Sequence, residues 1–263
     1  MALAIISTWA VIAVVSATTM PESTPSNPPP TLMTPVVPAT GAPAAITPSA
    51  ASTPAAVGFD KAAHSRSDPS SIWVVVDKLR PIPDGANYVP PDLVTTPAGI
   101  PNTHGHLLRQ GTSDAIVELF SAAKAEGGFQ LIVASGYRSF SSQTIGYSGY
   151  VSSLGQAGAD ATSARPGFSE HQTGMAADIL DSASGCGIEG ACFGNAPAGA
   201  WLAANAWRYG FILRYPADKT PVTGYEYEPW HFRFIGKDLA AEMHTTGVTT
   251  LEEFFGLPAA PTY

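Results

Sequence analysis

The sequence predicts an α+β fold: a mainly antiparallel central sheet with flanking helices, in a single domain behind a disordered linker. Two observations support this. Apolar runs rich in β-branched and aromatic residues predict several strands, and one amphipathic run predicts a long helix. These segments do not alternate as the repeated strand–helix–strand units that build parallel sheets. The 263 residues allow one or two domains.

The first part of the chain differs in composition from the rest. Residues 1–19 carry no charged side chain and suit either a signal peptide or, through residues 2–19, a membrane anchor. Residues 20–58 are mostly Pro, Ala, Ser and Thr with one charged residue, Glu22. Such a segment buries too little apolar surface to fold, which predicts a linker. We therefore expect the domain at 59–263 to be extracytoplasmic, secreted or anchored at the cell envelope.

Four elements are predicted in the first half of this domain. The amphipathic run at 113–126 predicts the clearest helix, with Ser113 as its N-cap and the pair Gly127 and Gly128 ending it. The other three are a β-branched strand, a buried apolar strand and a helix weakened by two glycines, at residues 72–80, 129–135 and 139–154.

Six more elements are predicted in the second half. An aromatic-rich strand at 225–236 is expected to break at Pro229, which cannot donate a ladder hydrogen bond. The others are a strand, an amphipathic helix that ends at a glycine, a short strand and two short helices, at residues 174–181, 198–210, 211–215, 237–247 and 250–256.

Charge and cysteine content narrow the possible partners. The formal net charge is −8, which argues against the clustered basic surface of a nucleic-acid-binding protein. Cys186 and Cys192 lie in one Gly-rich stretch, and so close a pair in an exported protein predicts a local disulfide. Zinc binding by the two cysteines is disfavoured, because no histidine lies nearby.

Two histidines and one aspartate form the candidate site. His171 and Asp178 lie in GFSEHQTGMAADI, where an unpaired buried carboxylate would be costly unless it met a cation or several donors. His231 lies in a second strand-like run, EYEPWHFRF. Two His and one Asp match the ligand types of a catalytic zinc. The alternative is structural: a buried His–Asp pair, and a His231 that hydrogen-bonds to backbone in an aromatic cluster.

Two further charged residues could complete a catalytic centre. Glu228 lies three residues before His231, and a regular strand would point the two side chains to opposite faces. A bend at Pro229 would let both face one centre, where Glu228 could act as a general base. Arg138 follows a buried strand and could neutralise an oxyanion or a substrate carboxylate. Each could equally be an ordinary surface residue.

Four motifs taken together resemble a known family. They are SGYRS, RPGFSEHQTGMAADI, GFILRYP and YEPWHFRFIG. In this order they resemble the VanY-type D-alanyl-D-alanine carboxypeptidases, of the zinc peptidase group that includes lysostaphin-like enzymes and the hedgehog amino-terminal domain. The resemblance covers about 72–257. It implies a zinc D,D-carboxypeptidase that acts on peptidoglycan stem peptides ending in D-Ala-D-Ala.

The resemblance also implies a role for each candidate residue. His171, Asp178 and His231 would hold Zn²⁺. Glu228 would be the catalytic base, and Arg138 would polarise the scissile carbonyl and stabilise the oxyanion. Three residues would line the substrate pocket, namely Ser169, Gln143 and Trp230.

Several alternatives stay open at this point. Within the zinc group, the chain could be a peptidoglycan endopeptidase or a D-Ala-D-Ala dipeptidase. A non-catalytic wall-binding module is disfavoured, because a pure binder needs no Glu228. Ser121 and Lys124 form an S-x-x-K match, the signature of serine-type D,D-peptidases, but no K-T-G follows. His104 and His106 could be a second metal pair, although their loop favours solvated side chains.

Overall fold

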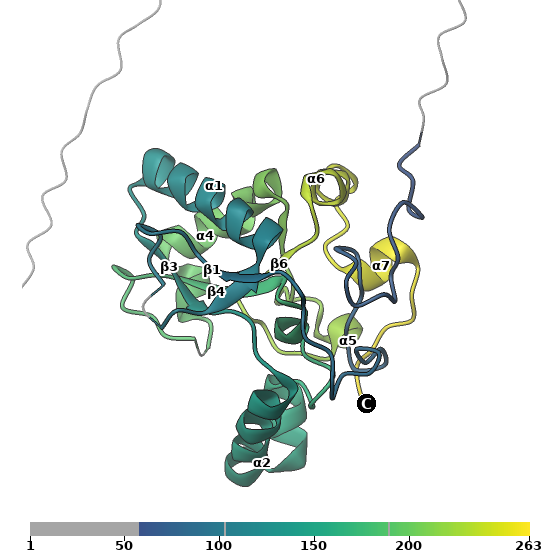
Figure 1. Ribbon diagram of the computed structural model, residues 1–263. Coiled ribbons are helices and arrows are strands. Elements are labelled where there is room, and N and C mark those ends of the chain that lie inside the picture. The colour runs from purple at the N-terminus through teal and green to yellow at the C-terminus, as the bar shows by residue number, and fades with distance from the viewer. Residues whose placement is uncertain (1–57, 103, 189) are drawn as a thin grey trace, which may run out of the picture. The chain divides into compact units, whose positions relative to one another are not determined.

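The computed structural model describes residues 58–102, 104–188 and 190–263 (Figure 1). The chain divides into two units, residues 1–55 and 56–263, and the second is described below. The predicted signal peptide or anchor and the predicted linker, up to residue 57, lie outside the described residues. Among the helices of the described part, none combines the length and the apolar character needed to cross a membrane.

A four-stranded antiparallel sheet forms the centre of the domain, in the order β3–β4–β6–β5. Its strands are β3 (Leu131–Ser135), β4 (Ala176–Asp181), β5 (Phe211–Leu213) and β6 (His231–Phe234). A separate antiparallel pair joins β1 (Leu93–Thr95) to β2 (Leu107–Arg109). The predicted α+β class with an antiparallel central sheet is confirmed.

Helices cover this sheet unevenly. The helical segments are α1 (Gln110–Gly127), α2 (Phe140–Thr162), α3 (Cys192–Asn195), α4 (Pro197–Asn205), α5 (Thr220–Thr223), α6 (Lys237–Thr246) and α7 (Leu251–Phe255), with 3₁₀ turns η1 (Glu170–Thr173) and η2 (Ala206–Tyr209). Helices α1 and α4 pack on one face of the sheet around Leu119, Ile179 and Phe232. Helices α6 and α7 enclose a second apolar cluster with Trp73 and Ile235, while α2 extends away from the sheet (Figure 1).

The predicted strand at 72–80 is wrong. Residues 73–76 are almost fully buried, but the segment pairs only through an isolated bridge between Asp77 and Arg80. Its side chains alternate between two apolar clusters. The apolar run is therefore explained by burial on both sides and not by hydrogen bonding to a neighbouring strand. The Arg233 side chain takes the place of a partner strand, because its Nη2 donates to Val74 O at 2.9 Å.

Two helix boundaries also differ from prediction. Helix α1 begins at Gln110, so Ser113 is buried within the helix rather than at its N-cap. The start is set by β2, which leads directly into the helix. The end is as predicted, with Gly128 left-handed at φ 69°. Helix α2 continues past residue 154 through a kink at Gly155, where φ is 72°.

Candidate active site

Strand pairing places two of the candidate ligands side by side. Asp178 on β4 and His231 on β6 are direct register partners, and such partners hold their Cβ atoms about 5 Å apart. Their sequence neighbours Ala177, Ile179 and Phe232 belong to the core beneath α1. Because side chains alternate along a strand, Asp178 and His231 point to the opposite face.

The third ligand comes from the turn just before β4. His171 lies on η1, which ends at Gly174 in the left-handed conformation. Its carbonyl accepts hydrogen bonds from Gly174 N at 3.1 Å and Arg138 N at 3.2 Å. Its ring Nδ1 lies 2.7 Å from Gly136 O, and a carbonyl can only accept. Nδ1 therefore carries the proton, which leaves Nε2 free to face Asp178.

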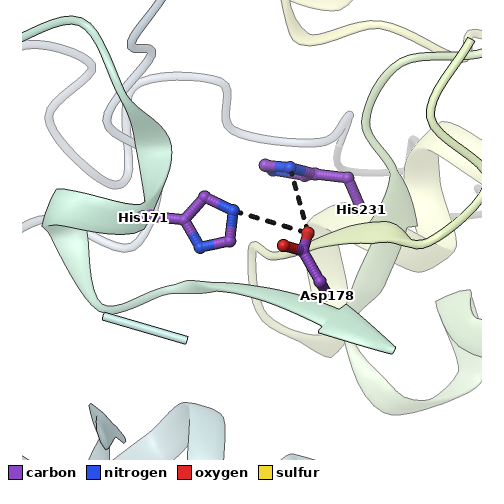
Figure 2. Close-up of side chains that lie close together, drawn as sticks. All are labelled: His171, Asp178 and His231. Carbon is purple, nitrogen blue, oxygen red and sulfur yellow. Dashed lines mark ion pairs between the residues drawn. The ribbon is translucent and has the colours of Figure 1, made fainter. Parts of the chain in front are cut away.

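These three side chains converge on one point (Figure 2). His171 Nε2 is 3.4 Å and His231 Nδ1 is 3.6 Å from Asp178 Oδ1, and the three atoms lie within 4.8 Å of one another. A tetrahedral zinc with bonds of about 2 Å would separate its ligands by roughly 3.3 Å. Asp178 Oδ1 is buried and makes no hydrogen bond within the described part of the chain. Geometry and donor types therefore fit zinc, and in 58–102, 104–188 and 190–263 no other such group occurs.

The surrounding charges favour a cation. Burial by itself would lower the pKa of His231, but the carboxylates of Glu170, Glu228 and Asp178 outweigh it and raise that pKa to about 9. Burial would likewise raise the pKa of Asp178, but the neighbouring positive groups, His171 first, hold it at about 2. The electrostatic field that retains a proton on His231 in the metal-free protein also attracts a divalent ion.

Glu228 lies beside the ligands but is not among them. Residues 228–231 form a turn in which His231 N donates to Glu228 O at 3.1 Å, so the predicted bend at Pro229 is present. Glu228 Oε2 consequently lies 3.4 Å from His231 Nδ1. Burial raises the pKa of the Glu228 carboxyl, which makes it a better proton acceptor than an exposed glutamate.

A cavity of about 380 Å³ opens onto this centre. Arg138 lines it, and within the described residues its side chain makes no hydrogen bond or ion pair. Ser169 and Trp230, both predicted pocket residues, line it as well, together with Tyr150 of α2 and Ile188 of the 186–192 loop. The lining also includes the three candidate ligands, Glu228 and several tyrosines, Tyr215, Tyr225 and Tyr227.

Gln143, the third predicted pocket residue, is placed differently. Its side chain is buried and is not part of the cavity lining. The amide donates to Ser163 Oγ at 3.2 Å and to Ala164 O at 2.6 Å, and both of these residues do line the cavity. Gln143 therefore supports one wall, and a direct contact with substrate stays a prediction.

The remaining motifs lie away from this centre. The predicted disulfide between Cys186 and Cys192 is present. Ser121 and Lys124 are exposed on α1 and do not line the cavity. His104 and His106 lie with ring centroids 5.7 Å apart, and no third candidate ligand joins them among the described residues.

Sequence reasoning missed a buried ionic group behind the site. Glu170, Arg214, Arg233 and Glu252 are linked by ion pairs of 2.7 to 2.9 Å, and their side chains are fully buried. A signal was available, because Arg214 and Arg233 interrupt the apolar runs FILRY and HFRF. A charge in such a run must be paired if it is buried.

A family model now adds to this geometry. The VanY family, described as D-alanyl-D-alanine carboxypeptidase, matches residues 105–237. The chain belongs to this family. YodJ of Bacillus subtilis (strain 168) is 40% identical over 191 residues, which make up 72% of this chain and 68% of YodJ.

Solved structures agree with the family. The LdcB LD-carboxypeptidase is 39% identical, with a TM-score of 0.65 over 72% of this chain and 87% of that one. A vancomycin resistance D,D-pentapeptidase VanY mutant in complex with Zn(II) is 34% identical, with a TM-score of 0.57; the match covers 69% of this chain and 97% of that one. The present chain is thus a zinc carboxypeptidase of the VanY family, and the cluster of His171, Asp178 and His231 fits its metal.

Proposed function

We propose that this VanY-family enzyme removes the C-terminal D-alanine from peptidoglycan stem peptides that end in D-Ala-D-Ala. One observation carries the proposal. The candidate ligands, the carboxylate of Glu228 and the guanidinium of Arg138, which forms no ion pair with any described residue, all line one cavity. A wall-binding module would need neither a buried base nor an unpaired cation beside its metal.

Each residue has a distinct task in hydrolysis. A zinc ion held by the three ligands would polarise the scissile carbonyl and lower the pKa of the attacking water. Glu228 Oε2 accepts a proton from that water and returns it to the leaving amine of the terminal alanine. The Arg138 guanidinium donates hydrogen bonds to the carbonyl oxygen as negative charge develops on it. Trp230 and Ser169 form part of the cavity wall around the reacting bond.

A second specificity is favoured by one comparison. LdcB, an LD-carboxypeptidase, is 39% identical to the chain. A D,D-enzyme cleaves after a D residue, whereas an LD-enzyme cleaves between an L and a D residue. The side chain on the acyl side of the bond consequently points in a different direction in the two substrates.

Mass spectrometry of defined peptides tests the proposal. The purified protein is incubated with a stem peptide ending in D-Ala-D-Ala, a shorter one ending in an L–D bond, a crosslinked dimer and free D-Ala-D-Ala. We expect loss of one alanine from the first, abolished by a chelator and restored by zinc. Cleavage of only the second would establish the LD-specificity. Products from the dimer or the free dipeptide alone would favour the endopeptidase or the dipeptidase.

The Glu228→Gln variant separates an enzyme from a binding module. It keeps the size of the side chain but removes the proton acceptor, so kcat should fall by about 10² to 10⁴. Zinc content should be unchanged, because Glu228 is not one of the three residues that offer a ligand atom to the metal. Wild-type protein with full zinc and no turnover on any peptide would contradict the proposal.

We also propose that the enzyme works outside the cytoplasm. The uncharged apolar residues 1–19 and the Pro-rich residues 20–58 support this, as does a substrate in the cell wall. Fractionation of cells that express the full chain, or the chain without residues 1–19, tests it. Equal recovery of both from the cytoplasm would contradict export, and membrane or medium recovery of the full chain would distinguish an anchor from a cleaved signal.

A further inference from the structure

The carboxylate next to His171 in the sequence contacts the other histidine of the site. Glu170 Oε2 lies 3.4 Å from His231 Nε2. Both atoms are buried, and neither has a hydrogen-bond partner within the described residues, so each atom is the polar neighbour of the other. His231 Nε2 lies on the opposite side of the ring from the edge that carries Nδ1, the atom that faces Asp178 at 3.6 Å. Glu170 is therefore placed behind the ring rather than among the candidate ligands.

The second oxygen of Glu170 is fully engaged. Oε1 accepts hydrogen bonds from Arg214 Nε at 2.8 Å and Arg233 Nη1 at 2.9 Å. Arg214 is held in turn by both oxygens of Glu252, at 3.0 and 2.7 Å. Arg233 Nη2 donates to Val74 O. These contacts fix the carboxylate, because any rotation of Glu170 would leave two buried guanidinium groups short of an acceptor.

We propose that Glu170 is a positioning residue that fixes the tautomer and the orientation of His231. Its Oε2 accepts the Nε2–H of the neutral imidazole, which leaves Nδ1 without a proton and aimed at the metal. His171 has the complementary arrangement, since Gly136 O holds the proton on its Nδ1 and leaves Nε2 free. The inference rests on the zinc site of the proposed function, but not on the identity of the peptide.

Only a carboxylate satisfies all of these donors. Arg214, Arg233 and the Nε2–H of His231 all donate, so both oxygens at position 170 must accept. A glutamine there would place its one oxygen against the two guanidinium groups and turn its NH₂ toward His231. The amide would then need Nε2 as an acceptor, and the ring proton would move to Nδ1. That tautomer cannot bind a metal through Nδ1.

The alternative is that Glu170 serves only the buried ionic group. Glu252 provides a matched control, because its side chain is equally buried and pairs with the same Arg214, but among the described residues no hydrogen bond or ion pair joins it to a candidate ligand. Glu170→Gln and Glu252→Gln should both lower thermal stability. Only Glu170→Gln should affect the metal.

Zinc affinity is measured for the two full-length variants and the wild type by competition with a chromophoric chelator. The measurement is made at a temperature where circular dichroism shows all three to be folded. Glu170→Gln should bind zinc about 10- to 100-fold more weakly, as is typical when the partner of a ligating histidine is lost. Glu252→Gln should bind close to wild type. Equal affinities, or an equal loss in both variants, would overturn the proposal.

A measurement on the wild type decides the question if Glu170→Gln does not fold. Long-range ¹H–¹⁵N correlation spectra of the zinc-loaded protein report which ring nitrogen carries a proton. We expect the proton on Nε2 of His231 and on Nδ1 of His171. A proton on Nδ1 of His231, or a wild-type protein that binds no zinc, would overturn the proposal. Neither measurement uses a peptide, so a failed cleavage assay is distinguishable from a failed positioning role.

Discussion

Three arginines near the site have different surroundings, and the difference assigns their roles. Arg214 and Arg233 are fully buried and paired with Glu170, so their charges are neutralised within the fold. Arg138 faces the cavity, and none of the described carboxylates lies within ion-pair distance of it. Its positive charge is available to a substrate oxygen, which is the arrangement expected for transition-state stabilisation.

Arg138→Ala should therefore lower kcat by about a hundredfold or more, because one electrostatic donor to the oxyanion is lost. Zinc content should stay the same, since the backbone N–H of residue 138 still donates to His171 O. Steady-state cleavage of the stem peptide measures the effect. Arg208→Ala is the control, because Arg208 is exposed and pairs with Glu126. An unchanged kcat in Arg138→Ala would remove this arginine from the mechanism.

At the scale of elements, the turn between η1 and β4 sets the distance between two ligands. Gly174 ends η1 with φ at 70°, a conformation that favours glycine. A Cβ at this position would lie 2.9 Å from both Arg109 Cγ and Leu93 Cδ2. The short spacing between His171 and Asp178 thus depends on a residue without a side chain.

Gly174→Ala should destabilise the fold by about 1–3 kcal/mol, the usual cost of a strained backbone position. The melting temperature should fall by roughly 2–4 °C for each kcal/mol in a domain of this size. Gly146→Ala is the matched control, because its Cβ would meet nothing within 4 Å on α2, and alanine favours a helix. It should raise the melting temperature slightly. Similar shifts of the same sign would contradict the role of the turn.

The second half of α2 is held by a charged hydrogen-bond group. Asp160 accepts from Arg165 Nε at 3.0 Å, Arg165 Nη2 at 2.8 Å and Tyr147 Oη at 2.5 Å. These bonds, from Arg165 first, hold the pKa of Asp160 far below its usual range. They connect α2 to the segment that leads to Ser169 in the cavity wall.

The sign of the resulting pH dependence follows from this lowered pKa. The stabilisation is present above about pH 4, where Asp160 would be ionised in the unfolded chain too, and it is lost as the pH falls below that value. Asp160→Asn should lose about 1 kcal/mol at pH 7, since the group is partly exposed. The gap in melting temperature between wild type and variant should shrink at pH 3. A gap that is constant with pH would show that Asp160 acts through its shape and not its charge.

Apolar runs in the sequence predicted strands correctly where the run pairs with a neighbouring strand, and failed where it does not. The runs at 129–135 and 174–181 became β3 and β4, and the register of β4 with β6 explains why the ligand motifs converge. The run at 72–80 is buried on both sides without a ladder, and no local pattern separates that state from a strand. The contact of Glu170 with His231 could not be predicted, because it depends on tertiary packing of β6 against η1.

For the molecule as a whole, the metal links parts of the chain that are distant in sequence. The ligands come from η1, β4 and β6, while the ionic group behind them joins Arg214, just after β5, to α7, and Arg233 of β6 to the segment at 72–76. Removing the metal leaves Asp178 Oδ1 buried without a hydrogen bond in the described part of the chain. Metal binding should consequently contribute to the stability of the entire domain.

Zinc should raise the melting temperature of the metal-free protein. At a free zinc concentration of 100 times the dissociation constant, the expected stabilisation is about 2.7 kcal/mol, or roughly 5–10 °C in a domain of this size. Differential scanning fluorimetry of the full chain, with chelator and then with added zinc, measures this shift. Asp178→Asn removes the anionic ligand while keeping the volume of the side chain, and it should abolish most of the shift. In the metal-free protein the lowered pKa of Asp178 shows that its charge is stabilised by the neighbouring positive groups, so the metal-free variant should melt somewhat lower than the metal-free wild type near neutral pH. A zinc-dependent shift of equal size in both proteins would show that the stabilising ion is bound elsewhere.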